Sequence, residues 1–128
     1  MHRKILVGLV ILIGIASGVT DETIIGEVSA RALEIGISPT VVKINEPSFG
    51  SELLILVYDD AITQSGQGHQ VASDLLTIGQ TVSMSYPERK IQQVYVAVTC
   101  KANDIEQGEF HQCEVYNAIG SGSSLGQY

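Results

Sequence analysis

The N-terminal segment limits what this chain can fold into more than any other stretch does. A short basic head, Met1 to Lys4, precedes an uncharged apolar run, Ile5–Val19, that ends in small residues. This order of basic head, apolar run and small residues is the layout of an export signal. The run has about 15 residues, fewer than the roughly 18 to 20 that a membrane-spanning helix needs. We therefore expect residues 1–19 to be a cleaved signal peptide or, if they are retained, a single membrane anchor.

Both outcomes predict the same location for the rest of the chain. A retained anchor would keep Arg3 and Lys4 in the cytoplasm, because basic flanks of a spanning helix stay inside. A cleaved signal would release the remainder outside the cytoplasm. We expect an extracytoplasmic domain, secreted or anchored to the cell membrane by residues 5–19. A buried core helix is the alternative, but it does not explain why a basic head precedes the run and Asp21 and Glu22 follow it.

The charge balance narrows the choice of partners. The chain carries 7 Lys and Arg against 14 Asp and Glu, a formal net charge of −7. Phosphate backbones bind clustered basic side chains, so we expect no nucleic-acid partner. The partners that remain are the membrane, through the N-terminal segment if it is uncleaved, and a protein of the cell envelope.

Hydrophobic spacing predicts two helices. Apolar residues three and four positions apart indicate a helix over 21–36, which Gly36 and Pro39 would end. Apolar residues at i, i+4, i+7 and i+11 indicate a second helix over 68–84, before Pro87. The two apolar stripes consist of Ile25, Val28, Ala32 and Ile35, and of Val71, Leu75, Ile78 and Val82.

Four apolar stretches predict strands. They cover residues 40–44, 52–58, 90–101 and 109–120. The stretch 52–58 is apolar on both alternating sets of positions, which is typical of a central strand. Residues 120–128 hold too little apolar content to pack and are expected to form a flexible tail.

The expected fold class is α+β. After the N-terminal apolar signal or anchor helix, the element order is α-β-β-α-β-β. A strand, helix, strand connection crosses right-handed, so both helices can cover one face of a sheet. We predict a two-layer sandwich whose four-stranded sheet is mainly antiparallel, in the simplest order 1-2-3-4, with two helices on one face. Residues 21–119 would form this single domain.

Cys100 and Cys113 are the only cysteines in the sequence. They flank the turn between the last two predicted strands, and a register that sets them opposite each other aligns apolar residues on one face. In an oxidising compartment such a pair forms a disulfide, here closing a loop of about a dozen residues and stabilising by roughly 2 to 3 kcal/mol. Two reduced core cysteines are the alternative. The same register pairs Val98 with Val115, Val96 with Asn117 and Val94 with Ile119.

A metal site is a weaker interpretation of the same region. His111 and Cys113 alternate along one strand and could face the same side, with Cys100 across the turn. A closed zinc site uses four ligands, and only these three can be named. We therefore expect no metal and no other cofactor.

The segment Leu56–Gln70 holds the candidate ligand site. Asp59 and Asp60 end the central strand, where ligands of α/β proteins often bind, and His69 follows a glycine-rich turn. In a functional interpretation, the acids bind a cation or exchange protons with a substrate, and His69 carries a proton. In a structural one, they form turns and cap a helix. The spacing matches neither a phosphate loop nor a dinucleotide fingerprint, which favours the structural interpretation.

The sequence contains no nucleophile elbow and no pair of histidines at helical spacing. We expect a small exported, non-catalytic domain with a binding or assembly role. One alternative is a filament or surface-layer subunit that retains its apolar N-terminus. Another is an enzyme or metal-binding protein that uses Asp59, Asp60 and His69. A recognition patch of tyrosines is a further hypothesis, with Tyr58, Tyr86, Tyr95 and Tyr116 as its members.

Overall fold

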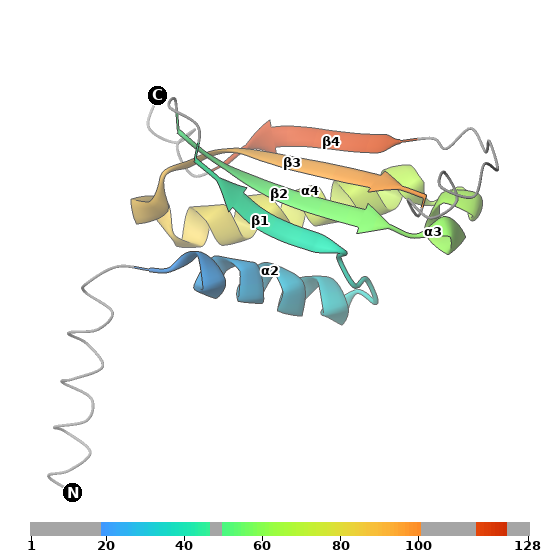
Figure 1. Cartoon of the computed structure of the whole chain (residues 1–128), viewed down its shortest axis with the longest axis horizontal. Coiled ribbons are helices and arrows are strands. Elements are labelled where there is room, and N and C mark those ends of the chain that lie inside the picture. Colours follow the sequence, from blue (N-terminus) through green and yellow to red (C-terminus); the bar gives the residue numbers. More distant parts are fainter. Residues whose placement is uncertain (1–18, 47–49, 101–114, 123–128) are drawn as a thin grey trace, which may run out of the picture.

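The computed structural model describes residues 19–46, 50–100 and 115–122 (Figure 1). The chain has the predicted α+β class, and its elements follow the predicted order with two short helices added. In chain order the elements are α2 (Asp21–Glu34), β1 (Val41–Asn45), β2 (Ser51–Tyr58), α3 (Asp60–Gln64), α4 (Gly68–Ser85), the 3-10 helix η1 (Pro87–Arg89), β3 (Ile91–Thr99) and β4 (Tyr116–Ser121).

The four strands form one sheet in the predicted order β1-β2-β3-β4. The outer pairs, β1 with β2 and β3 with β4, are antiparallel, but the central pair β2 with β3 is parallel. The expectation of a mainly antiparallel sheet was therefore wrong, and the sheet is mixed. The cause is α4. After β2 the chain returns through this helix to the end of the sheet where β2 began, so β3 runs in the same direction as β2.

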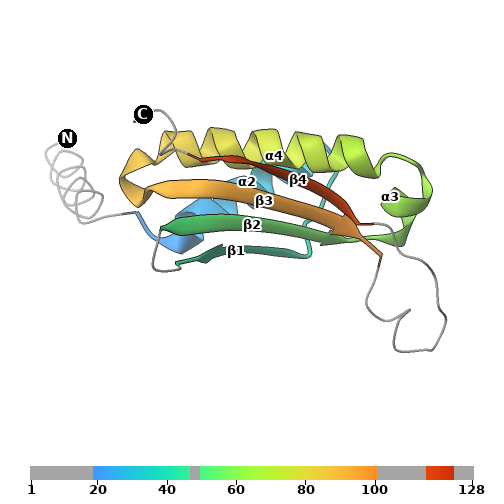
Figure 2. The same cartoon turned by 90° about the horizontal axis from the view of Figure 1, so that it is seen from above.

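Both long helices lie in one layer against one face of the sheet (Figure 2). The core lies between the two layers, where alternate residues of β2 and β3 meet the apolar sides of α2 and α4. Burial of each large side chain stabilises the fold by about 1.5 to 3 kcal/mol. The fully buried residues include Ile24, Val28, Leu53, Ile55, Leu75, Val82, Ile91, Val94, Val96 and Val98.

The end of α2 has a local cause. Gly36 adopts a φ of 81°, the left-handed conformation in which a glycine closes a helix. The N–H groups of Gly36 and Ile37 bond back to the carbonyls of Leu33 and Ala32, at 3.0 and 2.9 Å. The helix therefore stops at Glu34, two residues before the predicted end, and Ile37 is free to enter the core.

β4 pairs with β3 one residue away from the predicted register. Val98 lies opposite Tyr116 rather than Val115, so the predicted register was wrong. A shift of one residue exchanges the two faces of a strand. As a result Val115 and Ile119, which were expected on the core face, are 54% and 59% exposed.

The closeness of α4 explains this register. Gly120 faces the helix, and a Cβ atom there would lie 2.5 Å from Gln80 Nε2 and 3.2 Å from Leu76 Cδ1. A larger residue there would have to displace the Gln80 amide, which donates to the Ser121 carbonyl at 3.0 Å. The short distance to α4 therefore favours the observed register, in which Gly120 faces the helix and Ile119 turns outward, although hydrophobicity favoured the opposite arrangement.

The two ends of the domain are fixed by contacts with the core and the sheet. Val19 packs against the core, and the N–H of Gly122 donates to the Gln92 carbonyl at 3.0 Å. The predicted signal or anchor lies outside the described residues except for Val19, and so does the expected tail beyond Gly122. Of the helices that the structure describes, none has the length and apolar character that a membrane span requires.

Candidate functional site

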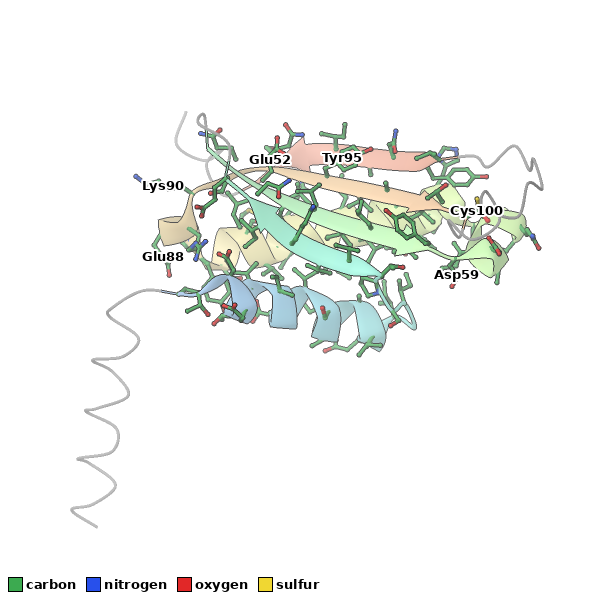
Figure 3. All side chains as sticks on the ribbon, in the orientation of Figure 1. Glu52, Asp59, Glu88, Lys90, Tyr95 and Cys100 are labelled. Carbon is green, nitrogen blue, oxygen red and sulfur yellow. The ribbon has the colours of Figure 1, made fainter. Side chains whose placement is uncertain are left out.

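The predicted ligand residues lie near the end of the sheet where the parallel strands β2 and β3 finish. Tyr58 and Thr99 pair at this end, and Asp59 and Cys100 follow them directly (Figure 3). His69 lies in the first turn of α4, which begins beyond the short helix α3. The topology therefore brings the predicted residues to one end of the molecule, as parallel strands would require.

Asp59 has a structural role in this arrangement. Its Oδ1 atom accepts the N–H groups of Ala61 at 2.9 Å and Ile62 at 3.3 Å, which makes it the N-cap of α3. Its own N–H donates to the Thr99 carbonyl at 2.8 Å and ties the strand end to β3. An acidic N-cap satisfies helix N–H groups that would otherwise lack partners. The capping interpretation of this residue is thus confirmed.

The segment between α3 and α4 forms a compact turn. Asp60 is the first residue of α3, and its carbonyl accepts the Thr63 hydroxyl at 3.0 Å. The Ser65 hydroxyl donates to the Ile62 carbonyl at 2.7 Å and accepts the N–H of Gln67 at 3.2 Å. Gly66, at a φ of 80°, supplies the left-handed step between the two helices.

Gly68 and His69 have a shared partner in Tyr116. A Cβ atom at position 68 would collide with the Tyr116 ring, so α4 can begin beside β4 only with glycine here. The rings of His69 and Tyr116 meet edge to face, with centroids 4.6 Å apart and planes at 80°. The glycine-rich turn is therefore explained by packing of α4 on β4. Sequence analysis named Tyr116 only as a member of a recognition patch and missed its contact with His69, because that contact depends on the shifted register of β4.

The three candidate residues do not form one constellation. Asp59 caps α3, Asp60 starts that helix, and His69 packs on Tyr116 from the start of α4. Within residues 19–46, 50–100 and 115–122, no group of three or more His, Cys, Asp or Glu side chains is arranged to hold a metal ion.

Cys100 directly follows β3 at this end of the sheet (Figure 3). Its predicted partner Cys113 and the alternative metal ligand His111 lie outside the described residues. The observed ladder between β3 and β4 ends at the pair of Val98 and Tyr116, before either cysteine, so it does not test the pairing. The disulfide between Cys100 and Cys113 stays a prediction.

The opposite end of the sheet contains a polar junction built on Arg89. Its guanidinium donates to the Val19 carbonyl at 2.7 Å, forms an ion pair with Asp21, and reaches Glu46 at 3.3 Å. The Arg89 side chain is only 19% exposed. One side chain therefore joins the start of α2, the end of the β1 segment and the approach to β3. Sequence analysis gave no signal for this junction, because its members are distant in sequence.

Tyr86 makes a second polar contact on the helix side. Its hydroxyl donates to Glu27 Oε1 at 3.3 Å, linking the end of α4 to α2. Burial, with the neighbouring Glu27 carboxylate as a further cause, raises the pKa of Tyr86. The other Glu27 oxygen is buried without a hydrogen-bond partner among the described residues. This contact fixes how the two helices pack, and it supplies no reactive group.

The face of the sheet opposite the helices has a composition of its own. We call it the open face and define it by the side chains of the four strands that alternate with the core residues. Strand register places them in rows across the sheet. The first row is Asn45, Glu52, Gln93 and Ser121; the second is Lys43, Leu54, Tyr95 and Ile119; the third is Val41, Leu56, Ala97 and Asn117; the fourth is Tyr58 and Thr99.

Polarity changes along the open face. The first row is entirely polar, whereas the second and third rows are mostly apolar. Ile119 is 59% exposed, and Leu54 and Leu56 remain partly exposed. Ala97 is only 7% exposed although it is not part of the core cluster. The open face is therefore an apolar surface with one polar end and a small residue at its centre.

The tyrosines do not form the single patch that we hypothesised. Tyr58 and Tyr95 belong to the open face, where the Tyr95 hydroxyl contacts Asn117 Oδ1 at 3.2 Å. Tyr86 and Tyr116 pack against the core on the helix side.

Comparison with known proteins adds no family to this description. The sequence matches no protein-family model, no curated protein and no solved structure.

Proposed function

We propose that this protein is a small extracytoplasmic domain, secreted or tethered by its N-terminal apolar segment, with a non-catalytic binding or assembly role. The observation that carries the proposal is the open face. Its apolar side chains, Leu54, Leu56 and Ile119 among them, lie on a sheet face that no described element covers. Apolar patches on soluble domains commonly mark interaction sites.

The arrangement of the candidate ligand residues supports the same proposal. Asp59 is engaged as a helix cap, and His69 is packed on Tyr116. The basic head and apolar run at the N-terminus support it as well, because an extracytoplasmic compartment would provide envelope proteins as partners and an oxidising environment for a disulfide between Cys100 and Cys113. Together these features favour a binding surface rather than a catalytic site.

The test is site-specific photocrosslinking in cells that express the full chain. A photoreactive residue replaces Ile119, on the open face, or Leu33, a matched control on α2 that is 61% exposed against 59% for Ile119. We expect a discrete crosslinked product from position 119 and none from position 33. Protease added outside the intact cytoplasmic membrane should degrade the protein in the same cells.

Two results would overturn the proposal. If neither position gave a product, or if both gave the same one, the open face would not be a specific binding surface. If protease that reaches only the outer side of the intact cytoplasmic membrane left the protein undegraded, the extracytoplasmic location would be wrong.

A further inference from the structure

We propose that the open face docks a second copy of this chain, sheet against sheet, about a two-fold axis that runs parallel to the strands between β2 and β3. This inference rests on the proposed binding role and names its partner. Two sheets that pack face to face keep their strands roughly aligned and about 10 Å apart. The same surface patch then serves both copies, as in most symmetric dimers.

Charge favours a second copy on this face. The chain has a net charge of −7, so its acidic surfaces repel one another in a homodimer. The open face is different, because its charged members are one base, Lys43, and one acid, Glu52. The other described acids lie off this face: Asp21, Glu22, Glu27, Glu34, Glu46, Asp59, Asp60, Asp74 and Glu88. Two copies can therefore meet here without bringing their acidic surfaces together.

The rows of the open face show what each direction of the axis would bring together. An axis parallel to the strands lays each row onto the same row of the second copy, so polar residues meet polar residues. An axis across the strands reverses the row order, so full overlap of the four rows places the first row on the row of Tyr58 and Thr99, and the second row on the third. Both directions keep the apolar second and third rows in contact, so the choice between them rests on the start of the domain.

The N-terminal end of the domain selects the axis parallel to the strands. The domain begins at Val19, and Arg89 holds this start beside the end of the sheet where β2 and β3 begin (Figure 1). The proposed apolar tether precedes it. The parallel axis brings the two tethers out at the same end, as insertion in one membrane requires. An axis across the strands would send them to opposite ends.

The proposed axis makes specific contacts. It places β2 of one copy over β3 of the other, so Leu54 lies over Tyr95 and Leu56 lies over the small, enclosed Ala97. A large side chain above a small one is the complementarity that well-packed interfaces show. It also places β1 over β4, so Lys43 of one copy lies over Ile119 of the second copy.

The first experiment measures the mass of the full chain in mild detergent over a concentration series. We expect a dimer that Ile119→Lys weakens by about tenfold or more, because the new positive charge would face Lys43 of the second copy. The matched control Leu33→Lys should leave the dissociation constant unchanged, since both residues are similarly exposed and neither supports the core. A monomer at all concentrations, or equal dimers in all three proteins, would overturn the inference.

The second experiment tests the axis itself. Ile119→Lys places a positive charge over Lys43 of the second copy and should weaken the dimer. The double variant Lys43→Glu with Ile119→Lys replaces repulsion by attraction and should restore most of the loss. If the double variant dimerises no better than Ile119→Lys alone, the proposed axis is wrong.

Crosslinking from position 119 separates this inference from the proposed function. A product with twice the mass of the chain supports both. A product with a different protein keeps the binding role and overturns the second copy as occupant. Absence of any product overturns the binding role as well.

Discussion

The two faces of the sheet are built from similar residues under different constraints. On the covered face, Leu53, Ile55 and Val57 are at most 1% exposed beneath the helices. On the open face, Leu54 and Leu56 come from the same strand and remain partly exposed. The fold explains the first set, because burial of these side chains holds the layers together. The fold does not require apolar side chains at Leu54 and Leu56, so their apolar character indicates that a partner covers them.

The sharpest way to test this contrast is a pair of adjacent substitutions on β2. Leu53→Ala removes a fully buried side chain and should lower the free energy of unfolding by about 2 to 5 kcal/mol. Leu54→Ala, on the open face, should cost about 1 kcal/mol or less in the monomer, because solvent already reaches that side chain. Urea denaturation of both variants at low protein concentration measures the difference. Equal losses would contradict the division into a core face and an open face.

A second contrast concerns two helical glycines. Gly79 of α4 lies so close to the sheet that a Cβ atom would be 2.6 Å from Val94 Cγ1 and 3.1 Å from Ile55 Cδ1. Gly79→Ala should therefore destabilise the fold by about 1 to 3 kcal/mol through overpacking. Gly26→Ala in α2 meets nothing within 4 Å and should stabilise by about 0.5 to 1 kcal/mol. Thermal unfolding of the two variants gives the signs, and a gain for Gly79→Ala would show that α4 can move away from the sheet.

The cap at the carboxyl end of β2 should have a smaller effect. Asp59→Ala removes the acceptor for two N–H groups of α3 and should cost about 1 kcal/mol, whereas Asp59→Asn keeps a capping oxygen and should cost a few tenths. Chemical denaturation of both variants measures these two losses in the free energy of unfolding.

The same residues also test the metal-binding alternative. The wild-type chain and the double variant Asp59→Asn, Asp60→Asn are heated with and without divalent cations. If Asp59 and Asp60 serve structure alone, cations should shift both melting temperatures equally. A shift seen only in the wild type would mean that these acids bind a cation.

An effect similar to that of Asp59→Ala is expected at Tyr86, on the covered side. Tyr86→Phe loses the bond to Glu27 and should cost about 1 kcal/mol at neutral pH. The folded chain holds the Tyr86 proton more tightly than the unfolded chain, because burial raises its pKa above the ordinary value of 10.0. The corresponding stability is present below about pH 10 and is lost as pH rises above it. Wild type should therefore lose more stability than the variant between pH 8 and about pH 11, and parallel losses would contradict the assignment.

Much of the fold could be predicted from local patterns. The apolar spacing of α4 and the alternation in β3 located those elements within one or two residues. The capping interpretation of the acids after β2 was also right for Asp59, although the helix that it caps, α3, was not predicted. These features depend on residues that are close in sequence, where helix and strand periodicity is informative.

The errors arose where distant segments meet. The register of β4 depends on the gap between Gly120 and Gln80, and the polar junction depends on Arg89 reaching Val19. The direction of β3 follows from the helix before it, which an expectation based on neighbouring strands overlooked. The periodicity of a segment predicts which of its residues are buried. It does not predict which distant segment packs against them, or how closely.

The parallel central pair also determines when this domain can fold. β2 has its β1 partner at once, but its other edge stays unpaired until α4 and β3 have been added. Pairings between segments distant in sequence form slowly, because a long loop must close first. A chain that crosses a membrane N-terminus first would thus present the apolar residues of β2 to the new compartment before their partners arrive. Under the proposed export, productive folding would depend on protection of that unpaired edge during transit.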